Sequence, residues 1–294
     1  MTLRLGRGVA VTALTTLMVA AICPCGAEEQ PEPGLVTIKC GGLTAELQRA
    51  HAWSLQGIMF EGVEIGTRTG AYGAVACVPA AGGWVGSAHS AGGVERVVDI
   101  ALIVDGEPVG LEDGAVYACD RAVLVKRSML DKLQLDATLI FEPEGITENH
   151  ELTATEDVVV TVLYPFVHCV SAATAEWMAV TTEGEEEAGE FESSDDLQWH
   201  EDWEWTAACI PGERTGLLMR ITRRPEDAPL LAGYWDRERD HRLYTKLVLD
   251  EDPWPEGRRV EAEVVVSCFR AAPGAWQETA RERAAELVAG GEPQ

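Results

Sequence analysis

DVVVTVLYPFVHCV, residues 157–170, is the stretch of this sequence that decides the fold. A period of two puts apolar side chains on both faces of this stretch, with Val158, Val160, Val162, Tyr164, Phe166 and His168 on one face and Val159, Thr161, Leu163, Pro165 and Val167 on the other. Such a pattern is typical of a central strand covered on both sides. Pro165 cannot donate a ladder hydrogen bond, so the pairing is expected to bend or stop there.

Strand patterns continue on both sides of this stretch. LVTIKC (35–40) and LTAELQ (43–48) flank Gly41-Gly42, and Asp105-Gly106 interrupts the alternating run 94–109. Both are hairpin signals. RVEAEVVVSCF (259–269) alternates almost without fault. The sequence therefore predicts roughly 15 or more antiparallel strands arranged as a large sandwich.

One helix is expected at the C-terminal end, between the starting signal Pro273-Gly274 and the stopping signal Gly290-Gly291. Its apolar stripe comprises Trp276, Ala280, Ala284, Leu287 and Val288. A helix with one apolar stripe has to bury it against another element. The predicted fold class is all-β, a large antiparallel β-sandwich in a single domain of residues 35–294, with one C-terminal helix packed on a sheet.

The N-terminal residues 1–27 have the features of a signal peptide. Arg4 and Arg7 precede the apolar run 9–22, and small residues end at Ala27, where we expect cleavage. A lipid anchor on Cys23 is the less favoured alternative. Residues 28–34 form an acidic, proline-containing leader that is expected to be disordered. The chain is thus predicted to be secreted or periplasmic, without an integral membrane segment after processing.

The charge is strongly acidic, with 49 Asp and Glu residues against 23 Lys and Arg residues and a formal net charge of −26. Such a chain repels nucleic acid, so no nucleic-acid partner is expected. Acidic side chains are most frequent in residues 183–204. We interpret this segment as a solvated surface loop, and we keep weak Ca²⁺ binding as the alternative because crowded carboxylates suit a hard cation.

Six cysteines remain after the predicted cleavage, and six cysteines allow 15 pairings. None of them has the two-residue spacing of a zinc site, and most lie within apolar strand patterns. We therefore expect buried small side chains with one or two disulfide bonds and no metal site.

Three segments carry a resemblance to a known family. They are ITENHELTATEDVVVTVLYPFVH (146–168), LVLDEDPWPEGRRVEAEVVVSCF (247–269) and WSLQGIMFEGVEIG (53–66). Their strand and turn order resembles the galactose mutarotase-like supersandwich, the fold of aldose 1-epimerases. The resemblance implies proton transfer at the anomeric centre of a sugar, which needs an acid and a base on opposite sides of the ring.

The resemblance also implies roles for particular residues. His168 matches the position of the family's acid, and Glu238 and Asp236 are the nearest candidates for the base, with His241 close by. His89, in a glycine-rich segment, is expected to contact sugar hydroxyls. We expect an open cleft at the end of the 157–168 strand, with His168 as its floor.

Tryptophans give a second, independent reason to expect a carbohydrate ligand, a mono- or oligosaccharide. Trp84, Trp177 and Trp235 lie near glycines, acids or strand ends, and a tryptophan ring is a good platform for the flat C–H face of a sugar. Two functions stay open: an epimerase-like or lyase-like enzyme, and a non-catalytic carbohydrate-binding or accessory domain.

Overall fold

The computed structural model describes residues 34–289, except 68–72, 88–92, 202, 227, 248 and 250–252. The predicted signal peptide, nearly all of the predicted leader, and His89 lie outside the described residues.

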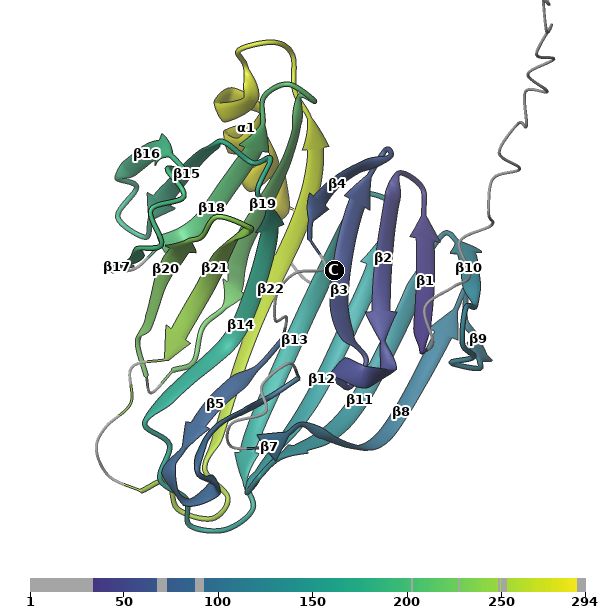
Figure 1. Cartoon of the computed structure of the whole chain (residues 1–294), viewed down its shortest axis with the longest axis vertical. Helices are drawn as coiled ribbons and strands as arrows, with labels where there is room; N and C mark the ends of the chain where they lie inside the picture. The colour runs from purple at the N-terminus through teal and green to yellow at the C-terminus, as the bar shows by residue number, and fades with distance from the viewer. Residues whose placement is uncertain are drawn as a thin grey trace, which may run out of the picture. The chain divides into compact units, whose positions relative to one another are not determined.

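Two large sheets, antiparallel except for the parallel pairs β1–β10 and β6–β7, make up most of the described chain, and the large β-sandwich that the sequence predicts is present (Figure 1). The twelve-stranded sheet has the order β10 (Val116–Cys119), β1 (Leu35–Cys40), β2 (Leu43–Gln48), β3 (Ser54–Phe60), β4 (Val63–Gly66), β14 (Val162–Ser171), β21 (Asp240–Leu247), β20 (Leu230–Asp236) and β17 (Leu197–Glu201), with β5 (Val75–Val78), β6 (Gly83–Gly86) and β7 (Gly93–Val94) attached beside β14. The ten-stranded sheet has the order β16 (Glu186–Glu190), β15 (Glu176–Thr181), β18 (Trp203–Ile210), β19 (Thr215–Arg223), β22 (Arg259–Arg270), β13 (Gly145–Ala154), β12 (Leu133–Glu142), β11 (Ala122–Leu130), β8 (Arg96–Val104) and β9 (Glu107–Val109).

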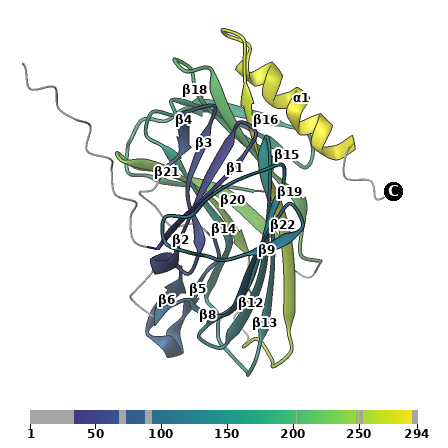
Figure 2. The ribbon, with the colours of Figure 1, turned by 90° about the vertical axis from the view of Figure 1, so that its right-hand side faces the viewer.

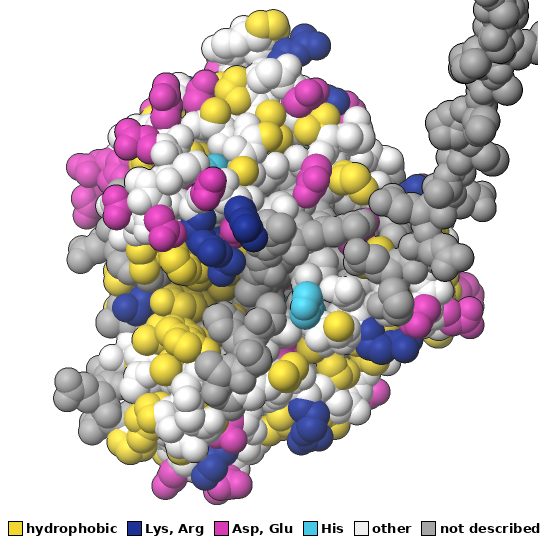
Figure 3. Space-filling model, in the orientation of Figure 1, with side chains coloured by type: hydrophobic (Ala, Val, Ile, Leu, Met, Phe, Trp, Pro, Cys, Tyr) yellow, Lys and Arg dark blue, Asp and Glu magenta, His cyan; other side chains and the backbone are white. Residues whose placement is uncertain are grey.

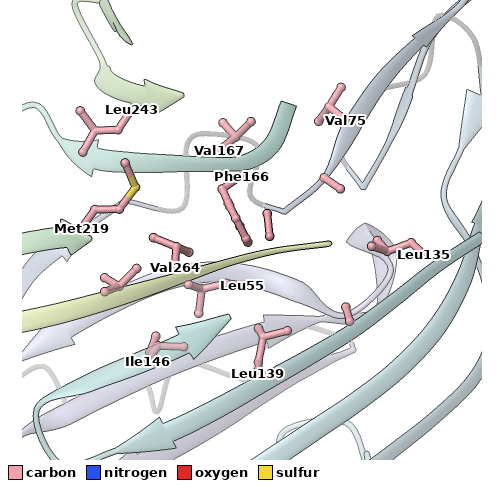
Figure 4. Packing of buried hydrophobic residues seen from close by; sticks show 14 of the residues in the cluster. Leu55, Val75, Leu135, Leu139, Ile146, Phe166, Val167, Met219, Leu243 and Val264 are labelled. Carbon is pink, nitrogen blue, oxygen red and sulfur yellow. The ribbon is translucent and has the colours of Figure 1, made fainter. Parts of the chain in front are cut away.

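The main hydrophobic core lies between the two sheets, which Figure 2 shows from the side. Alternation along each strand supplies it: on β12, Leu133, Leu135, Ala137, Leu139 and Phe141 are all buried. Figure 4 shows Phe166 and Val167 leaving opposite faces of β14, with Phe166 directed toward Val264 of β22. A central strand covered on both faces is therefore present, as expected.

The strand itself begins later than predicted. β14 starts at Val162, and Val158 makes only an isolated bridge with Trp254. The prediction of one strand from residue 157 is therefore wrong at its N-terminal end. Val159, which alternation would place in the core, is 40% exposed.

Pro165 disrupts the pairing as predicted. Leu163 pairs with Leu247 and Phe166 pairs with Thr245, so β14 has one more residue than β21 between these two pairs. An extra residue of this kind is a β-bulge. Because side chains alternate, the bulge puts Tyr164 on the face opposite Phe166 and His168, although an unbroken period of two would put all three together.

The hairpin predictions are confirmed. β1 and β2 pair across Gly41-Gly42, and β8 pairs with β9 across Asp105-Gly106. Asp105 and Gly106 have φ values of 48° and 88°, the left-handed backbone that a two-residue hairpin of this type requires.

The acidic segment 183–204 is not one structureless loop. Its strand β16 pairs with β15 of the ten-stranded sheet, and its strand β17 pairs with β20 of the twelve-stranded sheet. The segment therefore crosses from one sheet to the other.

The predicted helix is present as α1 (Trp276–Ala289), which packs on β18, β19 and β22. Trp276, Ala280 and Ala284 are buried against the sheet, as expected. Val288 was expected in the same stripe but is 54% exposed. No helix among the described residues is long and apolar enough to cross a membrane.

Candidate functional site

A cavity of about 270 Å³ opens on the face of the twelve-stranded sheet where β14, β20, β21, β5 and β6 meet. We call it the aromatic pocket. Its lining residues are Val75, Trp84, Tyr164, Val167, Leu197, Trp235, Arg242 and Tyr244. In Figure 3, hydrophobic side chains gather in a hollow on this face, with Lys and Arg side chains at its margin. Larger cavities of about 420 and 310 Å³ elsewhere are lined mainly by charged side chains, and one of about 370 Å³ has a mixed lining without aromatic rings.

The walls of the aromatic pocket are built from stacked rings. The rings of Trp84 and Tyr164 lie nearly parallel, 5.5 Å apart at an interplanar angle of 7°. Tyr164 also contacts Tyr244, with ring centroids 5.0 Å apart. The bulge at Pro165 makes this wall possible, because it puts Tyr164 on the same face as Val167, the partner of Tyr244.

The polar groups of the aromatic pocket are Arg242 and Tyr244. Burial raises the pKa of Tyr244 to about 12, although Arg242 opposes the rise through its charge and a hydrogen bond. The phenol therefore stays protonated at neutral pH and can donate a hydrogen bond. Arg242 Nε donates to Asp240 Oδ2 (2.6 Å), which fixes the direction of the guanidinium group.

Trp235 forms the opposite wall together with two arginines. The guanidinium carbons of Arg237 and Arg242 lie 4.6 and 5.6 Å from the centre of its ring. Trp235 Nε1 donates a hydrogen bond to the carbonyl of Asp195 (3.2 Å). Cation–π contacts and this hydrogen bond hold the indole in place, so its position is set before any ligand arrives.

His168 does not lie in this pocket, and the predicted cleft with His168 as its floor is wrong. The side chain is 1% exposed and faces the interior between the sheets. Its Nε2 donates a hydrogen bond to Glu148 Oε1 (2.7 Å). The physical reason is the bulge, which separates His168 from Tyr164 and turns the imidazole inward.

Glu148 and two histidines form a buried cluster at this point. His150 Nε2 lies 3.8 Å from Glu148 Oε2, and His150 Nδ1 donates to the carbonyl of Pro165 (2.8 Å). Burial by itself would raise the pKa of Glu148, but His168, His150 and Lys126 together hold it below its usual value. Burial lowers the pKa of His150. The carboxylate is therefore charged and paired within the core.

A second buried ion pair lies in the same interior. Lys126 Nζ is 2.7 Å from Glu95 Oε1 and also donates to the carbonyl of Ala52 (3.0 Å). Ser87 and Ser128 donate their hydroxyl groups to the Glu95 carboxylate. Every charged group here has partners, as buried ions require.

The candidate bases are also apart from the aromatic pocket. Glu238 is exposed on the turn between β20 and β21. Asp236 and His241 are buried, with Oδ1 and Nδ1 2.8 Å apart. Asp236 Oδ2 accepts hydrogen bonds from the backbone N–H groups of Glu192 and Ser194, so it anchors the acidic segment. The structure thus does not bring His168 and Glu238 together on one cavity.

Of the three predicted tryptophans, Trp84 and Trp235 line the aromatic pocket and Trp177 does not. Trp177 is 7% exposed and packs between the sheets. Its ring lies 5.7 Å from that of Trp203 and 5.1 Å from that of Tyr234.

The described residues contain no group of three or more His, Cys, Asp or Glu side chains arranged to hold a metal ion. Weak Ca²⁺ binding by residues 183–204 stays a prediction.

The sequence pattern does not identify Tyr164, Arg242 and Tyr244 as site residues. A strict period of two places Tyr164 on the face of His168. Tyr244 and Val167 come together through the register of β14 with β21, and no local pattern in the sequence signals that register.

No known family profile matches the chain. No curated protein matches its sequence.

Among solved structures, the chain is similar to an aldose 1-epimerase-type protein from Escherichia coli, at 11% identity over 82% of this chain and 100% of that protein, with a TM-score of 0.47. It is similar to a protein from Synechocystis sp. PCC 6803, at 9% identity over 82% of this chain and 98% of that one, with a TM-score of 0.49. It is also similar to a galactose mutarotase related enzyme from Lactobacillus acidophilus, at 10% identity over 80% and 97% of the two chains, with a TM-score of 0.46. At identities of 9–11% and TM-scores below 0.5, these similarities carry no conclusion about the function of this chain, which is argued from its own residues.

Proposed function

We propose that this protein binds carbohydrate in the aromatic pocket. The observation that carries the proposal is the arrangement of Trp84, Tyr164 and Trp235 around the polar pair of Arg242 and Tyr244. Aromatic faces suit the C–H face of a sugar ring, while the guanidinium group and the phenol suit its hydroxyl groups. At about 270 Å³, the cavity suits one or two sugar units rather than a long chain.

The rings also favour binding because their positions are fixed in advance. Trp84 and Tyr164 stack on each other, and Trp235 is held by Arg237 and Arg242. A ligand that enters such a pocket does not have to order these side chains, so little affinity is lost to conformational entropy.

Epimerase-like turnover is the second candidate. One observation bears on it: the Tyr244 phenol lies beside Arg242 and can donate a hydrogen bond to a sugar oxygen, but a pKa raised to about 12 makes it a weak acid for proton transfer near neutral pH. The acid and base first expected, His168 and Glu238, lie in the core and on an exposed turn. Binding without turnover is therefore the function that we favour.

Calorimetry of the full chain against a panel of neutral and acidic mono- and disaccharides tests the proposal, with polarimetric mutarotation measured in parallel. Trp84→Ala should weaken binding about 10-fold or more, because it removes one stacking wall. Arg242→Gln should weaken binding similarly by removing charged donors. Tyr117→Ala, an aromatic truncation on β10 at the far edge of the same sheet, is the matched control and should bind like the wild type.

The proposal fails if no sugar of the panel binds, or if Trp84→Ala binds as tightly as the wild type while remaining folded. Mutarotation above the uncatalysed rate, lost in Tyr244→Phe, would replace simple binding by the enzymatic candidate.

A further inference from the structure

Two cysteines far apart in the sequence meet at the edge of the twelve-stranded sheet. Cys40 ends β1 and Cys119 ends β10, and the two residues are direct partners in the parallel register of these strands. Their Sγ atoms lie 2.8 Å apart. Cys40 is buried and Cys119 is partly exposed. Two sulfur atoms at this distance are already closer than an ordinary van der Waals contact allows.

The geometry of the strands suits a covalent bond between these sulfurs. A disulfide bond needs Cα atoms roughly 4.4–6.8 Å apart and an S–S distance of about 2.05 Å. Neighbouring strands lie about 4.8 Å apart, so directly paired residues meet the first condition. The second requires the sulfurs to approach by less than about 1 Å, which a small rotation of each side chain supplies. We propose that Cys40 and Cys119 form a disulfide bond that joins β1 to β10.

The surroundings of the pair favour a disulfide over a metal site. Each sulfur also lies 3.7 Å from a backbone carbonyl oxygen, that of Phe141 for Cys40 and that of Lys39 for Cys119. No third cysteine, histidine or carboxylate completes a metal-binding group here among the described residues.

The chemistry requires a disulfide oxidant, and oxidised glutathione represents that class. The thiolate of Cys119, the more accessible sulfur, attacks oxidised glutathione, forms a mixed disulfide and releases one reduced glutathione. The thiolate of Cys40 then attacks the Cys119 sulfur and releases the second. Two protein thiols thus lose two electrons, and the oxidant leaves as two thiols.

The reaction should be slow near neutral pH. Burial raises the pKa of Cys40 to about 12, and burial is also the largest cause of the raised pKa of Cys119. The thiolate is the reacting form, so the rate should rise with pH.

The disulfide bond would strengthen the attachment of the short strand β10 to β1. β10 has only four residues and links β9 to β11, which both belong to the ten-stranded sheet, yet it pairs with β1 of the other sheet. A bond between Cys40 and Cys119 would fasten this crossing segment to the N-terminal strand. A cross-link between residues so far apart in sequence removes many conformations from the unfolded chain.

Peptide mapping of the full chain tests the proposal, after treatment with oxidised glutathione at pH 8 to 9 and alkylation of the remaining thiols under denaturing conditions. We expect a peptide in which Cys40 is joined to Cys119. The melting temperature of the oxidised chain should be higher than that of the reduced chain by about 5 °C or more, and reduction should bring it back to the lower value. Cys119→Ser should abolish this gain. Cys268→Ser, which changes a buried cysteine of β22, is the matched control and should keep it.

Recovery of Cys40 and Cys119 as alkylated thiols after oxidation would overturn the proposal, as would a linkage of either one to another cysteine. This result comes from the wild-type chain alone, so it does not depend on the folding of a variant. It is also independent of whether the aromatic pocket binds a sugar.

Discussion

His168 Nε2 lies 2.7 Å from Glu148 Oε1, and both side chains are buried between the two sheets. The histidine with the strongest sequence signal is therefore a partner of a core carboxylate. Removing it leaves a charge in the core with fewer partners, whereas removing a histidine at the rim of a cleft would leave the core intact.

The first prediction concerns this pair. His168→Leu should lower the free energy of unfolding by about 3 kcal/mol, because Glu148 loses its shortest hydrogen bond in the core. The double change Glu148→Leu with His168→Leu should cost less than the two single changes added together, since it removes the unpaired charge as well. Urea unfolding of the three variants measures both quantities. Strictly additive losses would show that the two side chains do not depend on each other.

The second prediction is a loss of stability on acidification. Burial lowers the pKa of His150 from its ordinary 6.5, so the unfolded chain takes up this proton first and stability falls as the pH drops below that value. The pKa of Glu148 is also lowered, from 4.5, and its contribution is present above that pH and lost below it. The urea midpoint, measured from about pH 7.5 down to 5, should therefore decline mainly through His150.

His150→Gln isolates that contribution, because an amide can still donate to the carbonyl of Pro165 but does not titrate in this range. It should flatten the decline between pH 6.5 and 5. His51→Gln, which changes a partly exposed histidine of the short 3₁₀ helix Arg49–His51, serves as the control and should leave the profile steep. An equally steep profile in His150→Gln would contradict the assignment.

The third prediction separates two tryptophans that the sequence places in the same class. Trp177→Ala should lower the free energy of unfolding by about 3–5 kcal/mol, because its buried ring packs on Trp203 and Tyr234. It should leave the sugar affinity of the folded protein unchanged. Trp84→Ala should weaken sugar binding and leave the free energy of unfolding nearly unchanged. Chemical unfolding measures the stability of both variants, and calorimetry measures their sugar affinity. An equal loss of affinity in the two variants would show that Trp177 also contributes to the binding site.

The fourth prediction concerns the acidic segment. Asp236→Ala removes the acceptor for the N–H groups of Glu192 and Ser194, so cleavage between residues 191 and 197 by a protease should become faster. Arg239→Ala, on the exposed turn nearby, should cleave like the wild type. Limited proteolysis followed by mass mapping identifies the cut sites.

Addition of millimolar calcium to the same experiment tests the expected weak cation binding of residues 183–204. Slower cleavage with calcium and unchanged cleavage with magnesium would support a specific site. The same rate in all three conditions would leave the segment as a solvated surface with no cation role.

Most of the fold follows from local pattern. The alternation of residues 259–269, the two hairpin signals and the apolar stripe of the C-terminal helix each predict an element that the structure contains. These signals depend on a short stretch of chain and its immediate neighbours. Val288 departs from its expected stripe because it lies in the last turn of α1, beyond the sheet contacts made by Ala280 and Ala284.

Less of the candidate site follows from pattern, because the site is made by pairing between distant strands. The chemistry of the tryptophan side chain is enough to predict Trp84 and Trp235 as site residues. Their meeting with Tyr244 depends on the register of β14 with β21 and on the attachment of β5 beside β14. The position of His168 depends on one bulge, and the sequence shows only the proline that accompanies it.

The bulge at Pro165 reverses which residues of β14 face the pocket. Before the bulge, an even-numbered residue, Tyr164, points to the pocket. After it, the even-numbered residues Phe166 and His168 point into the core. One residue less in this strand would put Tyr164, Phe166 and His168 on the same face, so the pocket would either gain an imidazole beside its tyrosine or lose the tyrosine to the core. The chemical character of this surface is thus encoded in the length of a strand as much as in the identity of its side chains.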